Sequence, residues 1–546
     1  MMLALLIILP LVFALVVVGR PAEHARSIAL VGTLVALVAC VAAMRAFDWS
    51  DAADTGQLGG SVAWLPALGL HLSVGVDSVA LLLIALTALL GPLCVLGSWT
   101  AIAEQRRTFY AWLLVLQAAM TGVFAARDLV LFYVCFEFTL IPMYVLISLF
   151  GSTNRRAAAT KFFLYTFTGS LLTLAGLLYV VWFVARPEQY GAWTFDIGVL
   201  TAYAPRMGGA EQGWVLLALL AGFAVKVPLF PVHTWLPLAH TEAPTAGSVI
   251  LAGVLLKLGT YGIYRFALPI APAAVVEHAP LIAVLSVVGI VYAGLICWVQ
   301  TDVKKLVAYS SVSHLGFCVL GLVALNGTGL SGSVMYMINH GLSTGALFLL
   351  VGMMYERYHT RSMRELGGLA AKMPVWATFT VFFAMASVGL PGLNGFVSEF
   401  LCILGAFQAD DGWGRFGDLP GATPGRLGPW FGLAAGTGVI IAAMYLLTMV
   451  GRMCFGPLVE PSGHGHGEEH AHDGGLPTDL TGREIGTLLP LAALCLGLGV
   501  YPSPILDSIR EPVNATVAHV LESAEGGGGV PVRPGVPGTL HAEGVR

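Results

Sequence analysis

Ionisable residues inside long apolar stretches are the residues of this sequence best suited to chemistry. Lys226 follows an apolar run that opens near Trp214, and the run breaks at Pro228 and Pro231. About twelve residues at a helical rise of about 1.5 Å each place the Lys226 ammonium near the middle of a hydrocarbon layer roughly 30 Å thick. A charge at that depth costs roughly 2.5–3.5 kcal/mol on insertion scales, so we expect it to have a function. The comparable residues at membrane depth are Glu137, Lys257, His314, His340 and Glu399.

These side chains all bind and release protons, and together they predict proton transfer along a line parallel to the membrane plane. Glu137 and Lys226 are predicted partners, because two unpaired charges at this depth would be costly. Moving the Glu137 carboxylate, or its proton, would then switch Lys226 between holding and releasing H⁺. Structural alternatives stay open: a buried salt bridge for this pair, snorkelling for Lys257, satisfied core histidines, and a local cap at Glu399.

Composition assigns the chain to the integral membrane proteins. Hydrophobic residues make up 57% and charged residues 11% of its 546 residues, against roughly 25% charged residues in soluble domains. A formal net charge of −4, without a Lys/Arg-rich run, argues against nucleic acid as a partner. The 8 cysteines never occur as CxxC or CxxxC, which argues against an iron–sulfur, zinc or disulfide framework.

Apolar stretches of about 18 residues or more predict an all-α polytopic membrane protein with about 14 transmembrane helices. Basic residues gather in alternate loops, so the positive-inside rule places both termini on the outer side of the membrane. The predicted spans are approximately 2–19, 27–47, 76–99, 108–126, 128–150, 158–185, 213–238, 244–268, 279–300, 304–325, 329–355, 374–407, 427–451 and 485–503.

Two inverted five-helix repeats are predicted within this array, over 108–268 and 279–451. The fourth helix of each repeat is interrupted, by Pro228 and Pro231 in the first and by Gly389-Leu390-Pro391-Gly392 in the second. Broken helices at matching positions of inverted repeats indicate an ion pathway at mid-membrane. The other predicted regions are N-terminal helices over 1–107, a cytoplasmic His-rich loop over 452–484, helix 14 over 485–503 and a flexible tail over 504–546.

The His-rich loop contains His464, His466, His470 and His472 beside acidic residues. Such a cluster can bind zinc or nickel adventitiously. We expect no functional metal site there, because Gly-rich spacing provides no rigid ligand geometry.

Four motifs resemble the antiporter-like subunits of respiratory complex I. The longest begins at Lys226-Val-Pro-Leu-Phe-Pro, continues through His240-Thr-Glu-Ala-Pro-Thr and ends at Lys257-Leu-Gly-Thr-Tyr-Gly. The resemblance spans roughly residues 76–455 and is closest to the subunit M (chain 4) type, because Glu399 stands where the L, N and Mrp D-type subunits typically carry lysine. The other motifs are Phe136-Glu137, Asp302-Val-Lys-Lys-Leu-Val-Ala-Tyr-Ser-Ser-Val-Ser-His314 and Gly389-Leu-Pro-Gly-Leu-Asn-Gly-Phe-Val-Ser-Glu399-Phe.

The resemblance implies a subunit in the membrane arm of a proton-pumping NADH:quinone oxidoreductase of the bacterial inner membrane. It implies that FMN, iron–sulfur clusters and quinone belong to other subunits, and that this chain binds no cofactor or metal. Its partners would be the lipid bilayer and other membrane subunits of the complex, among them the L- and N-type antiporter-like subunits.

The predicted proton path begins at Lys226 on the cytoplasmic side. It continues through Lys257, with His314 or His340 and ordered water, towards Glu399 and the outer face. Glu137 would set the proton affinity of Lys226 and receive the signal from a neighbouring subunit. Two other classes stay open: a subunit of an Mrp-type cation/proton antiporter that works without redox input, and a passive membrane scaffold between pumping neighbours.

Overall fold

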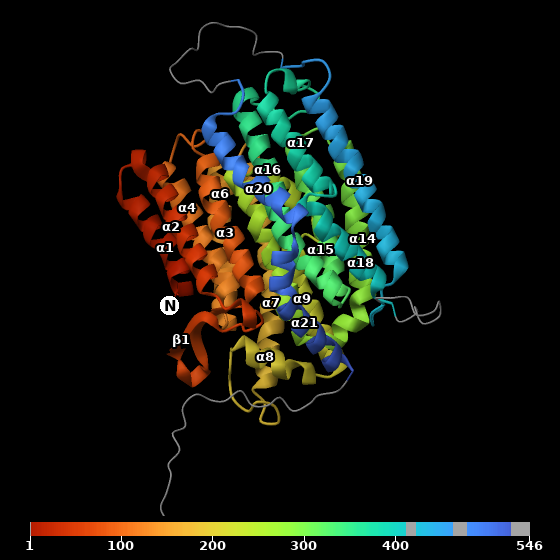
Figure 1. Cartoon of the computed structure of the whole chain (residues 1–546). Helices are drawn as coiled ribbons and strands as arrows, with labels where there is room; N and C mark the ends of the chain where they lie inside the picture. The colour runs from red at the N-terminus through yellow and green to blue at the C-terminus, as the bar shows by residue number, and fades with distance from the viewer. Residues whose placement is uncertain (1, 411–421, 462–477, 526–546) are drawn as a thin grey trace, which may run out of the picture.

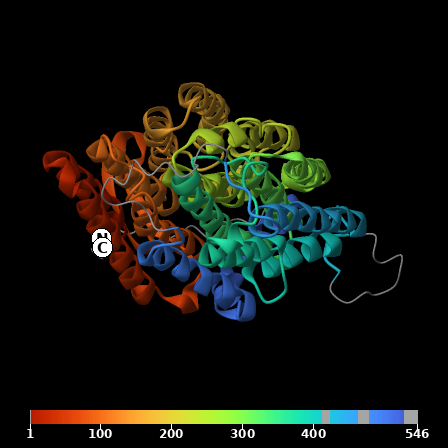
Figure 2. The same ribbon diagram turned by 90° about the horizontal axis from the view of Figure 1, so that it is seen from above.

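The structure is a computed structural model that describes residues 2–410, 422–461 and 478–525. Long helices run side by side through one bundle (Figure 1). Seen from above, α1 and α2 lie at one edge of the bundle (Figure 2). The long helices are α1 Met2–Gly19, α2 Ala25–Ala46, α3 Ser78–Gly97, α4 Arg106–Ala125, α5 Leu129–Phe138, α6 Leu140–Phe150, α7 Arg155–Val184, α9 Gly209–Lys226, α14 Pro272–Val299, α15 Val303–Val323, α16 Gly327–Tyr358, α17 Pro374–Val388, α18 Asn394–Gln408, α19 Pro429–Cys454, α20 Gly482–Val500 and α21 Ser503–Ala524.

Membrane-spanning helices dominate the described residues, which confirms the predicted all-α polytopic class. Among these residues, 12 helices are long and apolar enough to cross a membrane. The two other predicted spans, 213–238 and 374–407, are the interrupted ones, each divided into two shorter helices. This arrangement is consistent with the prediction of about 14 spans in two inverted repeats. The helix α16 runs through the centre of the bundle and is almost entirely buried.

The first interruption follows Lys226, the last residue of α9, and α10 begins at Leu236 and ends at Glu242. Proline lacks an N–H group and ends a helix, and Pro228 and Pro231 both lie in the gap. Carbonyl groups released by the break find other donors, because the indole of Trp235 donates to the Val225 carbonyl at 2.9 Å. The break therefore holds Lys226 at a helix C-terminus inside the bundle.

Glycine produces the second interruption, between α17 and α18. Gly389 ends α17 in the left-handed region, at φ 81°, where only glycine avoids a steric penalty. The backbone N–H groups of Gly389 and Leu390 both bond to the Met385 carbonyl. Gly395, in the first turn of α18, lies so close to α17 that a Cβ atom there would stand 2.0 Å from the Ala386 carbonyl oxygen.

The predicted span 244–268 contains two irregular turns that the sequence did not predict. It consists of α11 Thr245–Ile250, α12 Leu256–Gly262 and α13 Leu268–Ile270, joined by π-helical turns at Leu251–Leu255 and Ile263–Ala267. Such π-turns within α-helices occur frequently at functional sites. Lys257 lies in α12, between the two turns.

A small β-hairpin is an exception to the all-α expectation. The strands β1 Gln57–Leu65 and β2 Leu70–Val76 pair antiparallel, with Ser61 opposite Ser73. The hairpin lies at the same end of the bundle as α8 Ile197–Tyr203 (Figure 1).

The prediction of a flexible tail from residue 504 is wrong for its first part, because α21 occupies Ser503–Ala524. Ile509, Val513 and Val520 recur on one helical face and are buried against the bundle. The Glu511 carboxylate also accepts a hydrogen bond from the Ala52 N–H at 2.9 Å. The rest of the predicted tail, from residue 526, and residues 462–477 of the His-rich loop, with all four of its histidines, lie outside the described residues.

Candidate functional site

Lys257 and His340 form the central contact of the site. The Lys257 side chain is fully buried, and its Nζ lies 2.7 Å from Nδ1 of His340 in α16. Nζ also donates to the Ala252 carbonyl within the first π-turn. Because an ammonium group only donates, a protonated Lys257 leaves His340 neutral, with its ring proton on Nε2. That Nε2 atom has no hydrogen-bond partner among the described residues, so it is free to pass a proton on.

Tyr336 connects His314 to Glu399. The Tyr336 hydroxyl donates to Oε1 of Glu399 at 2.5 Å, and its oxygen lies 2.7 Å from Nδ1 of His314. The same His314 nitrogen lies 3.3 Å from Glu399 Oε1. A hydroxyl group both donates and accepts, so Tyr336 can take a proton from the imidazole while it gives one to the carboxylate.

The Lys257–His340 contact and the Tyr336 contacts approach each other at the two histidines, His340 and His314. The rings of His314 and His340 lie edge to face, with their centroids 5.9 Å apart. His314 Nε2 also lies 3.4 Å from the Tyr445 hydroxyl of α19. We call Lys257, His340, His314, Tyr336 and Glu399 the central cluster.

Gly389 makes room for the end of the central cluster. A Cβ atom at Gly389 would stand only 2.6 Å from Oε2 of Glu399. This oxygen has no hydrogen-bond partner among the described residues. The glycine that breaks the helix therefore also lets the Glu399 carboxylate approach the backbone of α17.

The predicted ion pair between Glu137 and Lys226 is absent from the described residues. Lys226 Nζ instead donates to the Phe136 carbonyl at 3.2 Å and to Oγ1 of Thr139 at 3.4 Å. It also lies 3.8 Å from the centroid of the Phe136 ring. The carbonyl is available because α5 ends at Phe138, and a helix C-terminus attracts cations. Both carboxylate oxygens of Glu137 are buried without a hydrogen bond of standard geometry among the described residues, and the hydroxyl groups of Tyr133 and Ser170 lie next to the carboxylate.

Apolar packing separates Lys226 from Lys257. A Cβ atom at Gly259 would stand 2.7 Å from a methyl carbon of Val227, so α12 packs tightly on the end of α9. No hydrogen bond within the described residues joins the two lysines. The predicted polar line is therefore two groups of residues: the central cluster, and the group that we call the Lys226 site, formed by Phe136, Glu137, Thr139 and Lys226.

A cavity of about 520 Å³ lies at the end of the bundle that carries the loop between α6 and α7. Glu242 and Lys304 line it, and Ser152 donates to the Glu242 carboxylate at 2.6 Å. His240, in the same short helix as Glu242, is buried and stacks on Phe348 with ring centroids 4.6 Å apart. Neither ring nitrogen of His240 has a partner among the described residues.

Comparisons with known proteins agree with this geometry. A family model described as "NADH:quinone oxidoreductase/Mrp antiporter, TM" matches residues 126–416. A protein of Rhodobacter capsulatus named NADH-quinone oxidoreductase subunit M is 41% identical over 536 residues, with 96% of each chain covered. This chain belongs to the subunit M (chain 4) family of NADH-quinone oxidoreductase.

Solved structures support the family assignment. A chain of respiratory complex I from Thermus thermophilus with bound NADH matches with a TM-score of 0.81 and 29% identity. The match covers 95% of this chain and 100% of that chain. A chain of the Mrp complex from Dietzia sp. matches with a TM-score of 0.78 at 22% identity, covering 96% and 99%, which is a likeness of fold alone.

Sequence reasoning missed three hydroxyl groups of this subunit M family member, on Tyr336, Tyr445 and Thr139. The signal for Tyr336 is its spacing, because it lies one helical turn before His340 and on the same face of α16. Thr139 stands at the junction of α5 and α6, in a span that reads as one continuous helix. Nothing in the local sequence distinguishes Tyr445 from other apolar-face tyrosines.

Proposed function

We propose that this chain, a membrane subunit of an NADH:quinone oxidoreductase, moves protons across the membrane through the central cluster. One observation supports the proposal most: five buried proton-binding side chains stand in sequence, with Lys257 and His340 in contact at one end and His314, Tyr336 and Glu399 in contact at the other. Buried polar residues in a membrane are costly, so a cluster of this kind needs a function.

The transfer runs from Lys257 to Glu399. His340 takes the lysine proton at Nδ1 while its Nε2 proton leaves towards His314 through one bridging water. His314 then passes a proton to the Tyr336 oxygen as the Tyr336 hydroxyl proton moves to Glu399. Each proton moved against a membrane potential requires about 2.3 kcal/mol per 100 mV, which redox chemistry in other subunits supplies.

Protons reach Lys257 from the end of the bundle that carries the Glu242 cavity. His240 stacks on Phe348 of α16, the helix that carries His340, and its ring nitrogens, which have no partner among the described residues, suit a relay. We assign this end to the cytoplasmic side, as the positive-inside rule predicts, and both termini to the outer side of a bacterial inner membrane.

The Lys226 site is the switch that neighbouring subunits control. The Glu137 carboxylate lies beside Tyr133 and Ser170 and forms no ion pair with Lys226 among the described residues, and the neighbouring residue Phe136 supplies the carbonyl that holds Lys226. Rotation of the carboxylate towards Lys226 would favour the charged lysine, and withdrawal would favour proton release. L- and N-type antiporter-like subunits are the proposed neighbours, and FMN, iron–sulfur clusters and quinone are assigned to other subunits of the complex.

A test of this function removes the lysine charge at the start of the central cluster. NADH-driven proton uptake is measured in membrane vesicles that carry Lys257→Met, with Lys305→Met, an exposed lysine of α15, as the matched control. We expect uptake to fall below about a tenth of the control, since each 1.36 kcal/mol added to a barrier slows a step about tenfold. Assembly is checked by NADH oxidation with an artificial acceptor. Normal uptake by an assembled Lys257→Met complex would exclude this transfer path.

The same vesicles test the Mrp-type alternative, for which the fold likeness to the Dietzia complex is the supporting observation. Exchange of sodium for protons without NADH, lost in Lys257→Met, would favour an antiporter. Proton uptake only during NADH oxidation would favour the redox-driven pump.

A further inference from the structure

The short helix α10 ends where it cannot complete its own hydrogen bonds. It has only 7 residues, Leu236–Glu242, and follows the break beside Lys226. Pro244 comes two residues later and has no N–H group to offer. The last carbonyl groups of a helix have no partner within it, so those of α10 need donors from other parts of the chain.

Four successive carbonyl groups at this end each accept a hydrogen bond from a different segment. Two of the donors are cations, Lys304 and Arg361, and a helix C-terminus attracts positive charge. Both cations belong to the second predicted repeat, whereas α10 belongs to the first, so the end of α10 joins the two repeats. The bonds are Ser248 Oγ to the His240 carbonyl at 3.1 Å, Arg361 Nη1 to the Thr241 carbonyl, the Ser152 N–H to the Glu242 carbonyl at 2.9 Å, and Lys304 Nζ to the Ala243 carbonyl at 2.5 Å.

Lys304 directs its charge at this helix end and not at a carboxylate. The residue is buried, and within the part of the chain that the structure describes it forms no ion pair. Two carboxylates lie nearby, on Glu242 and Asp302, but both have other partners. Glu242 accepts from the Ser152 hydroxyl and the Asn154 N–H, and Asp302 accepts from the first N–H groups of α15.

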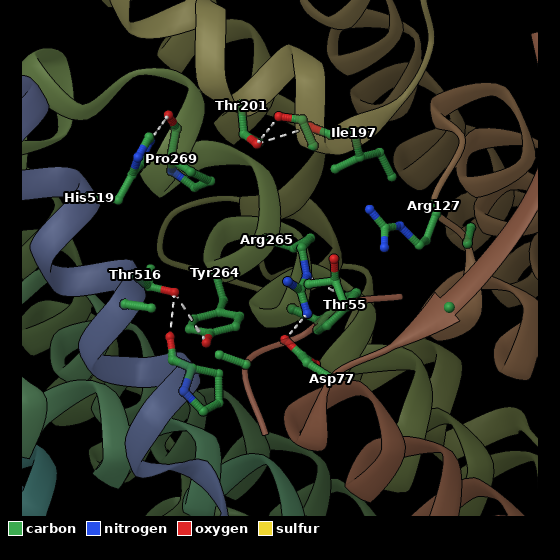
Figure 3. Close-up of a pocket in the computed structure, with 17 residues that line it drawn as sticks. Thr55, Asp77, Arg127, Ile197, Thr201, Tyr264, Arg265, Pro269, Thr516 and His519 are labelled. Atoms are coloured by element: carbon green, nitrogen blue, oxygen red, sulfur yellow. Dashed lines mark hydrogen bonds and ion pairs between the residues drawn. The ribbon is translucent and has the colours of Figure 1, made fainter. Parts of the chain in front are cut away.

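A second cavity, of about 240 Å³, shows the contrasting arrangement beside the hairpin, α8 and α21 (Figure 3). There the cation Arg265 faces the buried carboxylate of Asp77 and forms an ion pair with it (Figure 3). The Arg265 charge is thus neutralised by a side chain of opposite charge. The Lys304 charge is compensated by the carbonyl end of α10 instead, so Lys304 acts on the position of that helix.

His240 is held by the same end of α10. Its ring is fully buried and stacks on Phe348 of α16, with the two ring planes 4° apart. Its backbone carbonyl is the first of the four bound groups, and Ala243 follows it by three residues, which is less than one helical turn. A displacement of the Ala243 carbonyl therefore moves the imidazole relative to α16.

We propose that Lys304 is a positioning residue for proton entry: its bond to the Ala243 carbonyl holds the end of α10 and with it the imidazole of His240. This inference rests on the proposed function, in which His240 relays protons from the end of the bundle that carries the Glu242 cavity. Lys304 itself carries no proton along the path.

Loss of the Lys304 bond should leave α10 folded. Three other bonds remain at its end, and the cavity that Lys304 lines can admit water to the freed carbonyl group. We therefore expect the helix to persist but to hold the His240 ring less precisely.

The first test replaces the ammonium group and keeps most of the apolar stem. NADH-driven proton uptake is measured in membrane vesicles that carry Lys304→Met, and the matched control is Lys305→Met, at the exposed neighbouring lysine. Loss of a hydrogen bond from a charged group slows a step roughly tenfold, so we expect uptake to fall about tenfold in the first variant and to stay normal in the second. Lys304→Arg, which can still donate to the carbonyl, should restore most of the uptake. Assembly is checked by NADH oxidation with an artificial acceptor.

A second test separates a positioning role from general stabilisation. His240→Phe keeps the stacked ring and removes its nitrogens, so uptake should fall in this variant as well. If Lys304 acts through His240, Lys304→Met should lower uptake no further when His240→Phe is already present. Two independent effects would instead multiply, to roughly a hundredfold loss in the double variant.

Three results would overturn this role of Lys304. Equal uptake in Lys304→Met and Lys305→Met would show that the bond is not needed. Multiplying effects in the double variant would show that Lys304 acts independently of His240. Full uptake in His240→Phe would leave no relay for Lys304 to position. If Lys304→Met does not assemble, Lys304→Gln, which stays polar but loses the charge and the reach of the ammonium, takes its place with the same expected results.

The outcome is separable from the test of the proposed function. If Lys257→Met stops uptake while Lys304→Met behaves like Lys305→Met, the positioning role is wrong and the central cluster stands. If Lys257→Met pumps normally, the proposed function itself fails, and the role of Lys304 that rests on it fails as well.

Discussion

The central cluster and the Lys226 site contain similar residue types, but the contacts that these side chains make are different. In the central cluster, contacts of 2.5 to 2.7 Å join Lys257 to His340, and His314 through Tyr336 to Glu399. At the Lys226 site, the lysine is held by a backbone carbonyl and a threonine, and within the described residues the Glu137 carboxylate forms no ion pair with it. Proton-binding side chains in contact with one another suit transfer, whereas a lysine whose nearby carboxylate is not yet paired with it suits switching. We therefore assign proton transfer to the central cluster and its control to the Lys226 site.

The two helix breaks differ in the same way. Prolines break the helix beside Lys226 and leave the lysine at a helix end. Glycine breaks the helix beside Glu399, and its missing side chain admits the carboxylate. The proline break thus positions the Lys226 charge at a helix end, and the glycine break provides space for the Glu399 carboxylate.

Glu399→Gln is expected to have the largest effect on the central cluster. The amide keeps the shape of the side chain but cannot carry the transferred proton, so NADH-driven proton uptake should fall at least about tenfold. Glu522→Gln, at an exposed position of α21, is the control. Equal uptake in the two variants would mean that protons leave without Glu399. The central cluster would then not differ from the Lys226 site in the way described above.

Gly389→Ala should damage both stability and transport. A left-handed backbone costs an alanine roughly 1–2 kcal/mol, and its Cβ atom would collide with the Glu399 carboxylate. We expect less assembled complex in the membrane and a lower pumping ratio in what remains. Gly436→Ala, in a helix with open space around the position, is the control and should assemble normally.

Glu137→Gln sharpens the idea that the Lys226 site is a switch. The amide removes the charge that would draw a proton to Lys226, so the rate of proton uptake should fall while Lys226 stays bound to its carbonyl. The decisive measurement is the rate of NADH oxidation with quinone. This rate should fall together with proton uptake if the site is coupled to redox chemistry. A full oxidation rate with lost pumping would contradict a coupled switch and indicate simple transfer.

Thr139→Val should have the smallest effect. The hydroxyl contact with Lys226 is long, at 3.4 Å, and the Phe136 carbonyl remains. A loss of about 1 kcal/mol corresponds to roughly a fivefold change in one transfer step. A pumping loss as large as that of Glu399→Gln would show that the Lys226 site depends on direct contacts, as the central cluster does.

Much of this fold could be predicted from the sequence, because apolar length, proline and glycine act locally. The spans and both helix breaks follow from them. The position of each residue within its predicted span also placed Lys257, His340 and Glu399 in one layer near the middle of the membrane. It could not place Tyr336, because the contacts of this hydroxyl depend on how three helices are rotated about their axes. The absence of the Glu137–Lys226 ion pair has the same cause: the Phe136 carbonyl near the end of α5, which also accepts from the Thr139 hydroxyl at 2.7 Å, competes for the ammonium. The helix α21 was missed because its buried face is narrow and lies beside a Gly-rich segment.

Tyr336→Phe tests the central claim most directly, because one hydroxyl group joins His314 to Glu399 and the ring stays in place. The measurement is protons pumped per NADH oxidised in vesicles with assembled complex, with Tyr190→Phe, an exposed tyrosine, as the control. Loss of a hydrogen bond to a charged group, about 1.5–3 kcal/mol, should slow transfer roughly tenfold to a hundredfold and lower this ratio. A ratio equal to that of Tyr190→Phe would contradict proton transfer through the central cluster.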